Sequence, residues 1–160
     1  MSFSGDVYIL KVRVLLVSLF MIALPFDALY TGHCYWGPTS CEIDGAYEGY
    51  YTLLVGALAI FDYCPAWYAN VTFILALCLL ERCPTLAMKL SILTVLLALT
   101  TFLYDEPWND GGPTKYIMGY GPGFYIWLLA FVLCAFVCLR LPITSHSSSL
   151  RPKRAFTGRP

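Results

Sequence analysis

The sequence predicts an all-α membrane protein with four transmembrane helices and both termini in the cytoplasm. Of its 160 residues, 59% are hydrophobic and only 12% are charged, whereas soluble domains average about 45–50% apolar and about 25% charged residues. Uncharged stretches recur that approach the length of about 20 residues needed to cross a bilayer. The charges between these stretches also alternate in sign along the chain. This composition argues against a soluble enzyme, a disordered chain and a nucleic-acid-binding protein.

The four expected helices form one transmembrane domain, residues 1–144, and cover about residues 8–29, 62–81, 85–104 and 119–140. The first helix reaches full length if its two basic residues extend their charged ends to the interface. Pro25 would loosen its last turn. A cleaved signal peptide over residues 1–30 is the alternative interpretation of this segment.

The distribution of charge predicts the orientation. All ten lysine and arginine residues except Lys115 fall in segments that alternate crossings place on one side. The intervening segments are acidic, and an excess of basic residues marks the cytoplasmic side of membrane proteins. The end of the chain, residues 145–160, is rich in serine, proline and arginine, so we expect a disordered basic cytoplasmic tail.

The second apolar region is too long for one crossing. Residues 49–80 contain a single charge, Asp62, and one helix of that length would measure about 48 Å against a hydrocarbon core of about 30 Å. Because Pro65 interrupts helical hydrogen bonding, we expect a break there and a short interfacial or re-entrant apolar helix at about residues 51–61. Asp62 is then a candidate ion or proton site. The alternative is an interfacial carboxylate that binds backbone groups freed by the proline.

Aromatic residues concentrate on the acidic, outer side of the predicted topology. Aromatic belts ordinarily form at both interfaces, so this one-sided excess predicts either an aromatic-cored cap or a binding surface, where tyrosine and tryptophan are favoured. The candidate partner-binding residues are Tyr35, Trp36, Tyr50, Tyr51, Trp108 and Tyr120.

Two of the seven cysteines suggest a disulfide. Cys34 and Cys41 lie in the first outer segment, where an oxidising compartment would let them pair. A thiol–disulfide relay of the four-span, quinone-linked kind would need a second outer pair, and the second outer loop has no cysteine. Four other thiols, which could in principle bind a metal, are interpreted as small packing residues: Cys78, Cys83, Cys134 and Cys138. We expect no metal, no cofactor and no catalytic residue.

Three short motifs carry a resemblance. They are LPFDALY at residues 24–30, AWYAN at 66–70 and GYGPGFYIWL at 119–128. Together they resemble a loose group of small four-span bacterial inner-membrane proteins that has no assigned activity. The resemblance implies the same topology and a bacterial source. This chain departs from the group at Val71, where the group usually has proline.

These observations predict a non-enzymatic integral membrane protein that binds a partner through its aromatic, acidic outer face. It could be an accessory subunit of a membrane complex or an immunity-type protein, located in the bacterial inner membrane. Expected partners are membrane lipid and another membrane or periplasmic protein, or a second copy of the chain, but not nucleic acid. The first alternative is a small oligomeric transporter or channel that uses Asp62. The second is a thiol–disulfide redox membrane protein.

Overall fold

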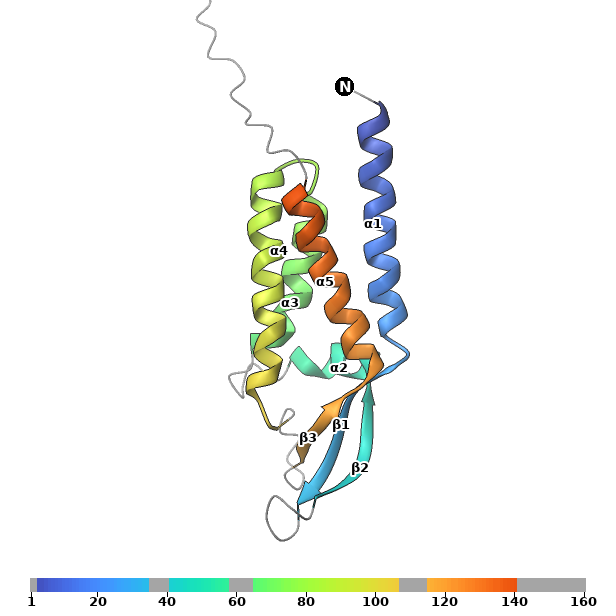
Figure 1. Cartoon of the computed structure of the whole chain (residues 1–160), viewed down its shortest axis with the longest axis vertical. Helices are drawn as coiled ribbons and strands as arrows, with labels where there is room; N and C mark the ends of the chain where they lie inside the picture. Colours follow the sequence, from blue (N-terminus) through green and yellow to red (C-terminus); the bar gives the residue numbers. More distant parts are fainter. Residues whose placement is uncertain (1–2, 35–40, 58–64, 107–114, 141–160) are drawn as a thin grey trace, which may run out of the picture.

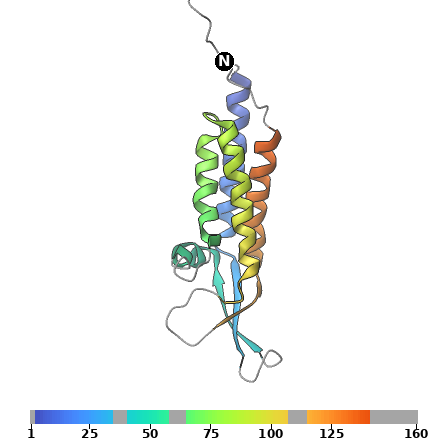
Figure 2. The same cartoon turned by 90° about the vertical axis from the view of Figure 1, so that its left-hand side faces the viewer.

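The computed structural model combines a bundle of helices with a small sheet at one end of it (Figure 1). It describes residues 3–34, 41–57, 65–106 and 115–140. Two views at right angles show the long helices side by side, with the sheet beyond one end of them and the N-terminus at the other (Figures 1 and 2). The elements in chain order are α1 (Phe3–Ala23), β1 (Asp27–Cys34), β2 (Cys41–Glu48), α2 (Gly49–Val55), the 3₁₀ turn η2 (Pro65–Trp67), α3 (Tyr68–Leu79), α4 (Pro84–Leu99), the 3₁₀ turn η3 (Thr100–Leu103), β3 (Tyr116–Tyr120) and α5 (Pro122–Arg140).

The expectation of an all-α protein with four transmembrane helices is wrong. The fold contains a three-stranded antiparallel sheet. Within the described residues, two helices are long and apolar enough to cross a membrane, Pro84–Leu103 and Pro122–Arg140. Within the described part of the helix expected over residues 62–81, a 3₁₀ turn of 3 residues leads into an α-helix of 12 residues. This segment, Pro65–Leu79, is shorter than the helices that could cross a membrane.

The first helix also differs from the expectation, because it lies nearer the N-terminus. It was expected over residues 8–29, but α1 ends at Ala23, two residues before Pro25. Proline disfavours helical backbone in the residue that precedes it. The amide of Phe26 bonds to the carbonyl of Ala23 at 3.3 Å in a closing turn. The chain then enters β1 at Asp27, although residues 27–29 were expected to be the end of the first membrane helix.

The sheet has the order β2-β1-β3, with β1 in the centre. Tyr30 on β1 faces Ala46 on β2 and Gly119 on β3. The connection from β2 leads directly into α2, which lies across the helix ends beside the sheet (Figure 1). A short apolar helix was expected at about residues 51–61, whereas α2 covers Gly49–Val55.

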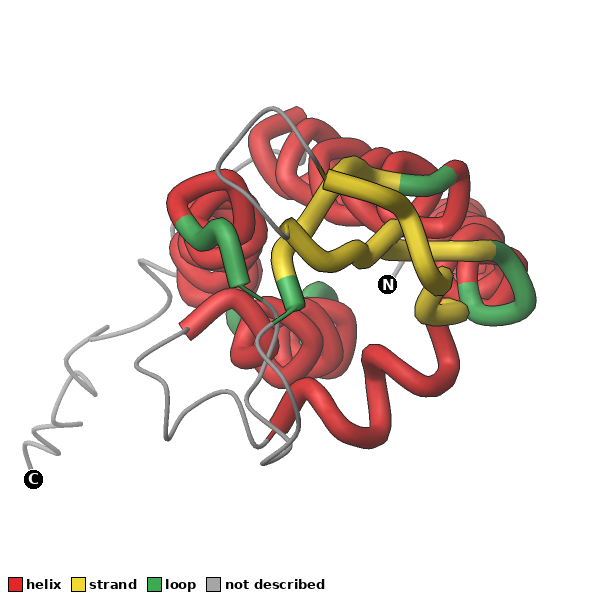
Figure 3. Tube along the Cα trace, turned by 90° about the horizontal axis from the view of Figure 1, so that it is seen from below, coloured by secondary structure: helices red, strands yellow, loops and turns green. Residues whose placement is uncertain are grey.

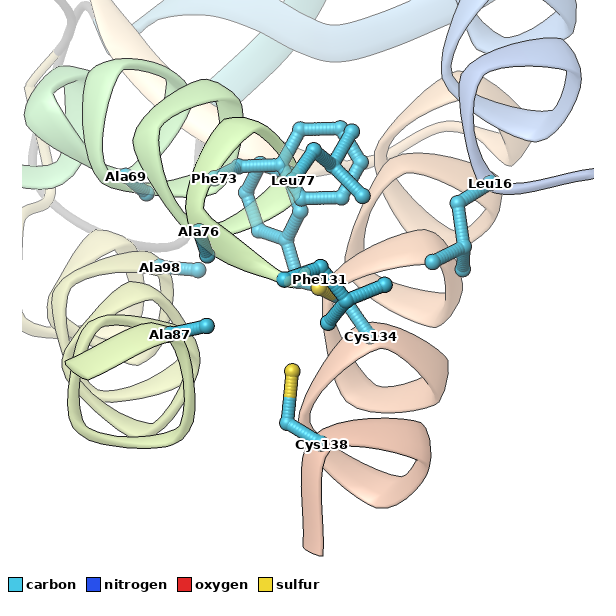
Figure 4. Close-up of a cluster of buried hydrophobic side chains, with 11 residues drawn as sticks. Leu16, Ala69, Phe73, Ala76, Leu77, Ala87, Ala98, Phe131, Cys134 and Cys138 are labelled. Atoms are coloured by element: carbon cyan, nitrogen blue, oxygen red, sulfur yellow. The ribbon is translucent and has the colours of Figure 1, made fainter. Parts of the chain in front are cut away.

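The interior of the bundle combines large apolar side chains, such as Phe73 and Phe131, with many small and weakly polar ones. Four alanines of α3 and α4 are fully buried (Figure 4): Ala69 and Ala76 on α3, and Ala87 and Ala98 on α4. The same helices bury two hydroxyl side chains, Ser91 and Thr94. The hydroxyl of Thr94 bonds to that of Thr72 across the two helices at 2.8 Å. Small residues and interhelical hydroxyl bonds are typical of helices that pack within a membrane.

The exterior of the bundle is apolar on each of its long helices. Val14 on α1, Leu96 on α4 and Leu139 on α5 are more than half exposed, at 57%, 58% and 58%. Large aliphatic residues on the outward faces distinguish this bundle from a water-soluble one, whose apolar stripe faces the core and whose outward face is polar. The bundle therefore presents a surface suited to hydrocarbon.

Two glycines let the sheet and the bundle approach closely. The amide of Gly121 donates to the carbonyl of Ala28 at 2.9 Å. A side chain at Gly121 would overlap the carbonyl oxygen of Asp27, and one at Gly123 would come within 2.6 Å of that of Phe26. The start of α5 is thus held against the segment that joins α1 to β1.

Candidate functional site

A pocket of about 130 Å³ lies where the helical bundle meets the sheet and α2. Helices α1, α3 and α5, strands β1 and β3, and α2 all contribute to its lining. Seen along the bundle, the sheet crosses the helix ends and α2 runs beside it (Figure 3). An apolar cavity of about 150 Å³ in another protein binds benzene. The pocket is close to that size, which suits one ring-sized apolar group.

The walls of the pocket are mainly apolar and aromatic. Phe124 and Trp127 of α5 line it, with ring centroids 5.6 Å apart. Trp127 in turn lies 4.4 Å from Phe131, which is fully buried in the bundle. Phe20 of α1, another lining residue, stacks on Phe73 at 5.6 Å. The pocket floor is therefore continuous with the aromatic core of the bundle, which fixes the orientation of these rings.

One buried amide supplies hydrogen bonds inside the pocket. Asn70 lines the pocket and is only 6% exposed. Its Oδ1 accepts a hydrogen bond from Nε1 of Trp127 at 2.8 Å, and its Nδ2 donates to the carbonyl of Trp67 at 3.0 Å. A carboxamide nitrogen carries two hydrogens. The second N–H is thus available to an acceptor atom in the pocket.

The side of the pocket formed by α2 is attached through Trp67. Its Nε1 donates to the backbone carbonyl of Leu53 at 2.7 Å. Gly56 lies against the same indole, so that a Cβ there would be 3.0 Å from Cδ1 of Trp67. This contact holds α2 over the pocket although the helix has only 7 residues. Leu53 lines the pocket, whereas the adjacent Leu54 is 74% exposed and does not.

The polar opening of the pocket is formed by the segment after α4. Thr101, Tyr104 and Glu106 line it there. The hydroxyl of Tyr120 donates to the carbonyl of Thr101 at 3.1 Å, which attaches β3 to η3. Glu106 is exposed as well as pocket-lining, so this residue lies where the pocket meets solvent.

Of the predicted partner-binding residues, the three that the structure describes do not share one exposed surface. Tyr50 is half exposed, but Tyr51 stacks on Tyr47 at 5.2 Å and packs against the buried pair Ala28 and Leu29. Tyr120 contacts Phe124 at 4.5 Å. Tyr51 and Tyr120 are thus part of the junction between sheet and bundle. The other predicted residues, Tyr35, Trp36, Trp108 and Asp62, lie outside the described residues, as does the predicted tail over 145–160.

The cysteines fall into two groups. Cys34 and Cys41 face each other directly across β1 and β2, and Cys41 is not one of the free thiols. The side chain of Cys34 is not among those that the structure describes, and no disulfide joins two of the described side chains. The bond between Cys34 and Cys41 therefore stays a prediction. The four free thiols are Cys78, Cys83, Cys134 and Cys138. Among the described side chains, no group of three or more histidines, cysteines or acids could hold a metal ion.

No protein-family model, curated protein or solved structure matches the chain. Its function is therefore inferred from the geometry of the site. Sequence reasoning did not identify Asn70, Glu106 or Trp127 as members of one site. Asn70 is a signal that could have been noticed, since an amide within an apolar run is costly in a membrane unless it has hydrogen-bond partners. Trp127 and Glu106 belonged to the aromatic and acidic outer side without a reason to single them out.

Proposed function

We propose that this protein is a non-enzymatic membrane protein that binds a small apolar ligand in the pocket between its helical bundle and its sheet. The observation that carries the proposal is the pocket of about 130 Å³ whose walls are mainly apolar and aromatic. Ligand sites are concave and mostly apolar, with a few polar groups that orient the ligand. Here the second N–H of Asn70 would be such a group, because it can donate to an acceptor atom on the ligand.

The membrane part of the proposal is supported by the bundle. Pro84–Leu103 and Pro122–Arg140 have the length and hydropathy to cross a bilayer, and most outward residues of α1 are apolar as well. The pocket then lies at one end of the hydrocarbon layer, next to the sheet, where both lipid and water are near. An apolar molecule dissolved in the bilayer would reach a site at that depth.

We further propose that the sheet lies on the outer side of a bacterial inner membrane. At the opposite end of the bundle, Arg13 of α1 pairs with Glu81 at 3.0 Å. Several other basic residues lie toward that end, and acidic residues predominate in the sheet and its neighbouring turns. Because basic residues favour the cytoplasmic side, the first residues of α1 and the last of α5 would face the cytoplasm.

Titration with an aromatic hydrocarbon tests the proposal. Propylbenzene would be added to the protein in nonionic maltoside micelles, and the indole N–H resonance of Trp127 would be followed by NMR. We expect a saturable shift, because this N–H donates to Asn70 beside the pocket. A Leu53→Trp variant fills the pocket and should lose the shift. The matched control Leu54→Trp places the same side chain on the exposed face of α2 and should keep it. A shift that never saturates, or that survives in Leu53→Trp, would reject the pocket as a binding site.

Binding of a protein partner through the outer face is a second candidate. It is favoured by Tyr50, which is 50% exposed on α2 although its neighbours pack inward. Crosslinking in native membranes, followed by isolation of the tagged chain, would compare the wild type with Tyr50→Ala. We expect a specific crosslinked band that weakens in the variant. An identical band in both would remove Tyr50 from the candidate surface.

A further inference from the structure

We infer that the ligand of the pocket is a cationic amphiphile, whose ring-sized apolar group occupies the pocket and whose ammonium group lies at the opening beside Glu106. The inference rests on the proposed function and specifies its ligand class. It is carried by the combination of an aromatic pocket, a carboxylate at its opening and a buried amide inside it.

Glu106 offers an uncompensated negative charge. Within the described part of the chain its carboxylate forms no ion pair. A cation bound beside it would gain a favourable charge interaction, and an anion would be repelled. The carboxylate thus distinguishes ligands that an apolar wall alone would treat alike.

The surroundings of Glu106 carry the same sign of charge. The described acidic residues of the sheet and its adjoining segments are Asp27, Glu42, Asp44, Glu48, Asp105 and Glu106, and Lys115 is the basic residue of the same region. Lys115 already lies 3.4 Å from the hydroxyl of Tyr47 and 5.6 Å from the centroid of its ring. Asp44 is paired with His33 at 2.9 Å. The remaining acidic residues still outnumber the basic ones at the sheet end of the molecule, and this excess of negative charge attracts cations.

The aromatic lining suits a cation at the edge of the pocket. Trp67, Tyr104 and Trp127 line it together with Phe124. Faces of aromatic rings attract an ammonium group within about 6 Å, and tryptophan does so most strongly. The inner end of the pocket contributes Asn70, which is nine-tenths buried and retains an N–H for an acceptor atom. The arrangement fits a molecule with an apolar ring inside and a positive charge outside.

Three probes with one carbon skeleton separate charge from shape. The probes are 3-phenylpropylammonium, propylbenzene and 3-phenylpropionate, titrated at pH 7 into nonionic maltoside micelles with the Trp127 indole resonance as readout. The pocket-filled variant Leu53→Trp measures partition of each probe into the micelle. We expect the ammonium probe to bind about three- to tenfold more tightly than propylbenzene, from the combined charge and cation–π attraction. The carboxylate probe should bind more weakly than either.

Two neutralising variants assign the preference to its residue. Glu106→Gln removes the charge at the opening and should bring the affinity of the ammonium probe close to that of propylbenzene. Asp105→Asn removes the same charge one residue away, at a side chain that does not line the pocket, and should leave most of the preference in place. Since both variants change net charge equally, a general field effect would appear in both.

The outcomes distinguish the inference from the proposed function. If propylbenzene binds saturably and the ammonium probe binds no more tightly, the inference is rejected and the apolar pocket stands. Equal loss of preference in Glu106→Gln and Asp105→Asn would also reject it, because the charge beside the pocket would not matter. If none of the probes binds saturably in the wild type, the proposed function fails together with the inference.

Discussion

The two halves of this molecule are stabilised in different ways. In the bundle, small or hydroxyl side chains such as Ala98 and Thr94 are fully buried beside the rings of the core, while large aliphatic residues such as Leu96 face outward. At the junction with the sheet, the contacts are made by aromatic rings and by backbone hydrogen bonds across glycines. The bundle requires close helix packing in an apolar solvent, whereas the junction requires close backbone contact at the edge of that solvent. The aromatic rings that line the pocket contact both the bundle and the sheet, as Trp127 contacts Phe131 and Phe124 contacts Tyr120. These contacts fix the rings around the pocket.

The strongest test of the junction is Gly121→Ala. The added methyl group would overlap the Asp27 carbonyl oxygen, and backbone cannot give way as a flexible side chain does, so we expect a loss of about 3 kcal/mol or more in the free energy of unfolding. Gly119→Ala, two residues earlier in β3, is the control, since its Cβ would be 3.9 Å from the nearest atom, a carbon of Tyr30. Denaturant titration in micelles measures both. Equal stability of the two variants would contradict the close contact.

The outer surface of the bundle is tested by Leu96→Arg. Leu96 is 58% exposed, so in water an arginine there would change stability little. In a bilayer, arginine near the middle of a helix costs about 3 kcal/mol, and we expect that loss in bicelles. Leu54→Arg on α2, where the leucine is 74% exposed at the sheet end, should be well tolerated. Full tolerance of Leu96→Arg in bicelles would place this face of α4 away from lipid.

The close packing of the bundle is tested by Ala98→Leu. Ala98 has no exposed surface, so the larger side chain must push helices apart, and we expect a loss of about 2 kcal/mol. The reverse exchange at the next position, Leu99→Ala, removes a side chain that is 43% exposed and should cost less than about 0.5 kcal/mol. Unfolding in micelles compares the pair. A larger effect at Leu99 would show that the inward and outward faces are assigned the wrong way round.

The smallest expected effect concerns a single hydrogen bond of the junction. Tyr120→Phe removes the hydroxyl that donates to the Thr101 carbonyl at 3.1 Å, while its ring contact with Phe124 is kept. We expect a loss of about 1 kcal/mol, together with faster hydrogen exchange of β3 amides. Tyr125→Phe, at a ring that is 56% exposed, serves as the control. Unchanged exchange in β3 would mean that this bond does not attach the strand.

The sequence predicted the two long C-terminal helices closely and the sheet not at all. Residues 85–104 and 119–140 were expected as helices, and helical structure covers Pro84–Leu103 and Pro122–Arg140. Both are apolar runs with a proline at the start, and their few charges, Lys89 and Arg140, lie near an end of the run; these are local signals. By contrast, β1 pairs with β3 some 90 residues later along the chain, through Leu29 and Tyr120, and hydropathy alone carries no sign of such a pairing.

The pocket was out of reach of sequence reasoning for the same reason. Its lining residues extend from Phe20 to Trp127, and their meeting depends on the glycine contacts at the start of α5. The aromatic excess on the outer side was visible in the composition, but it was interpreted as a surface. In the structure, Tyr51 and Tyr120 pack inward instead, which leaves Tyr50 as the exposed member among the described candidates.

The position of a bound aromatic hydrocarbon decides whether the junction pocket is a binding site. Nuclear Overhauser effects would be recorded between the ring protons of propylbenzene and side chains of α5 in the wild-type protein. Binding in the pocket requires contacts to the indole of Trp127 and to Phe124, which line it, and these contacts should vanish in Leu53→Trp. Contacts only to Leu129, which is 48% exposed on the outer face of the same helix, would show that the hydrocarbon stays in the surrounding micelle and would contradict the proposed function.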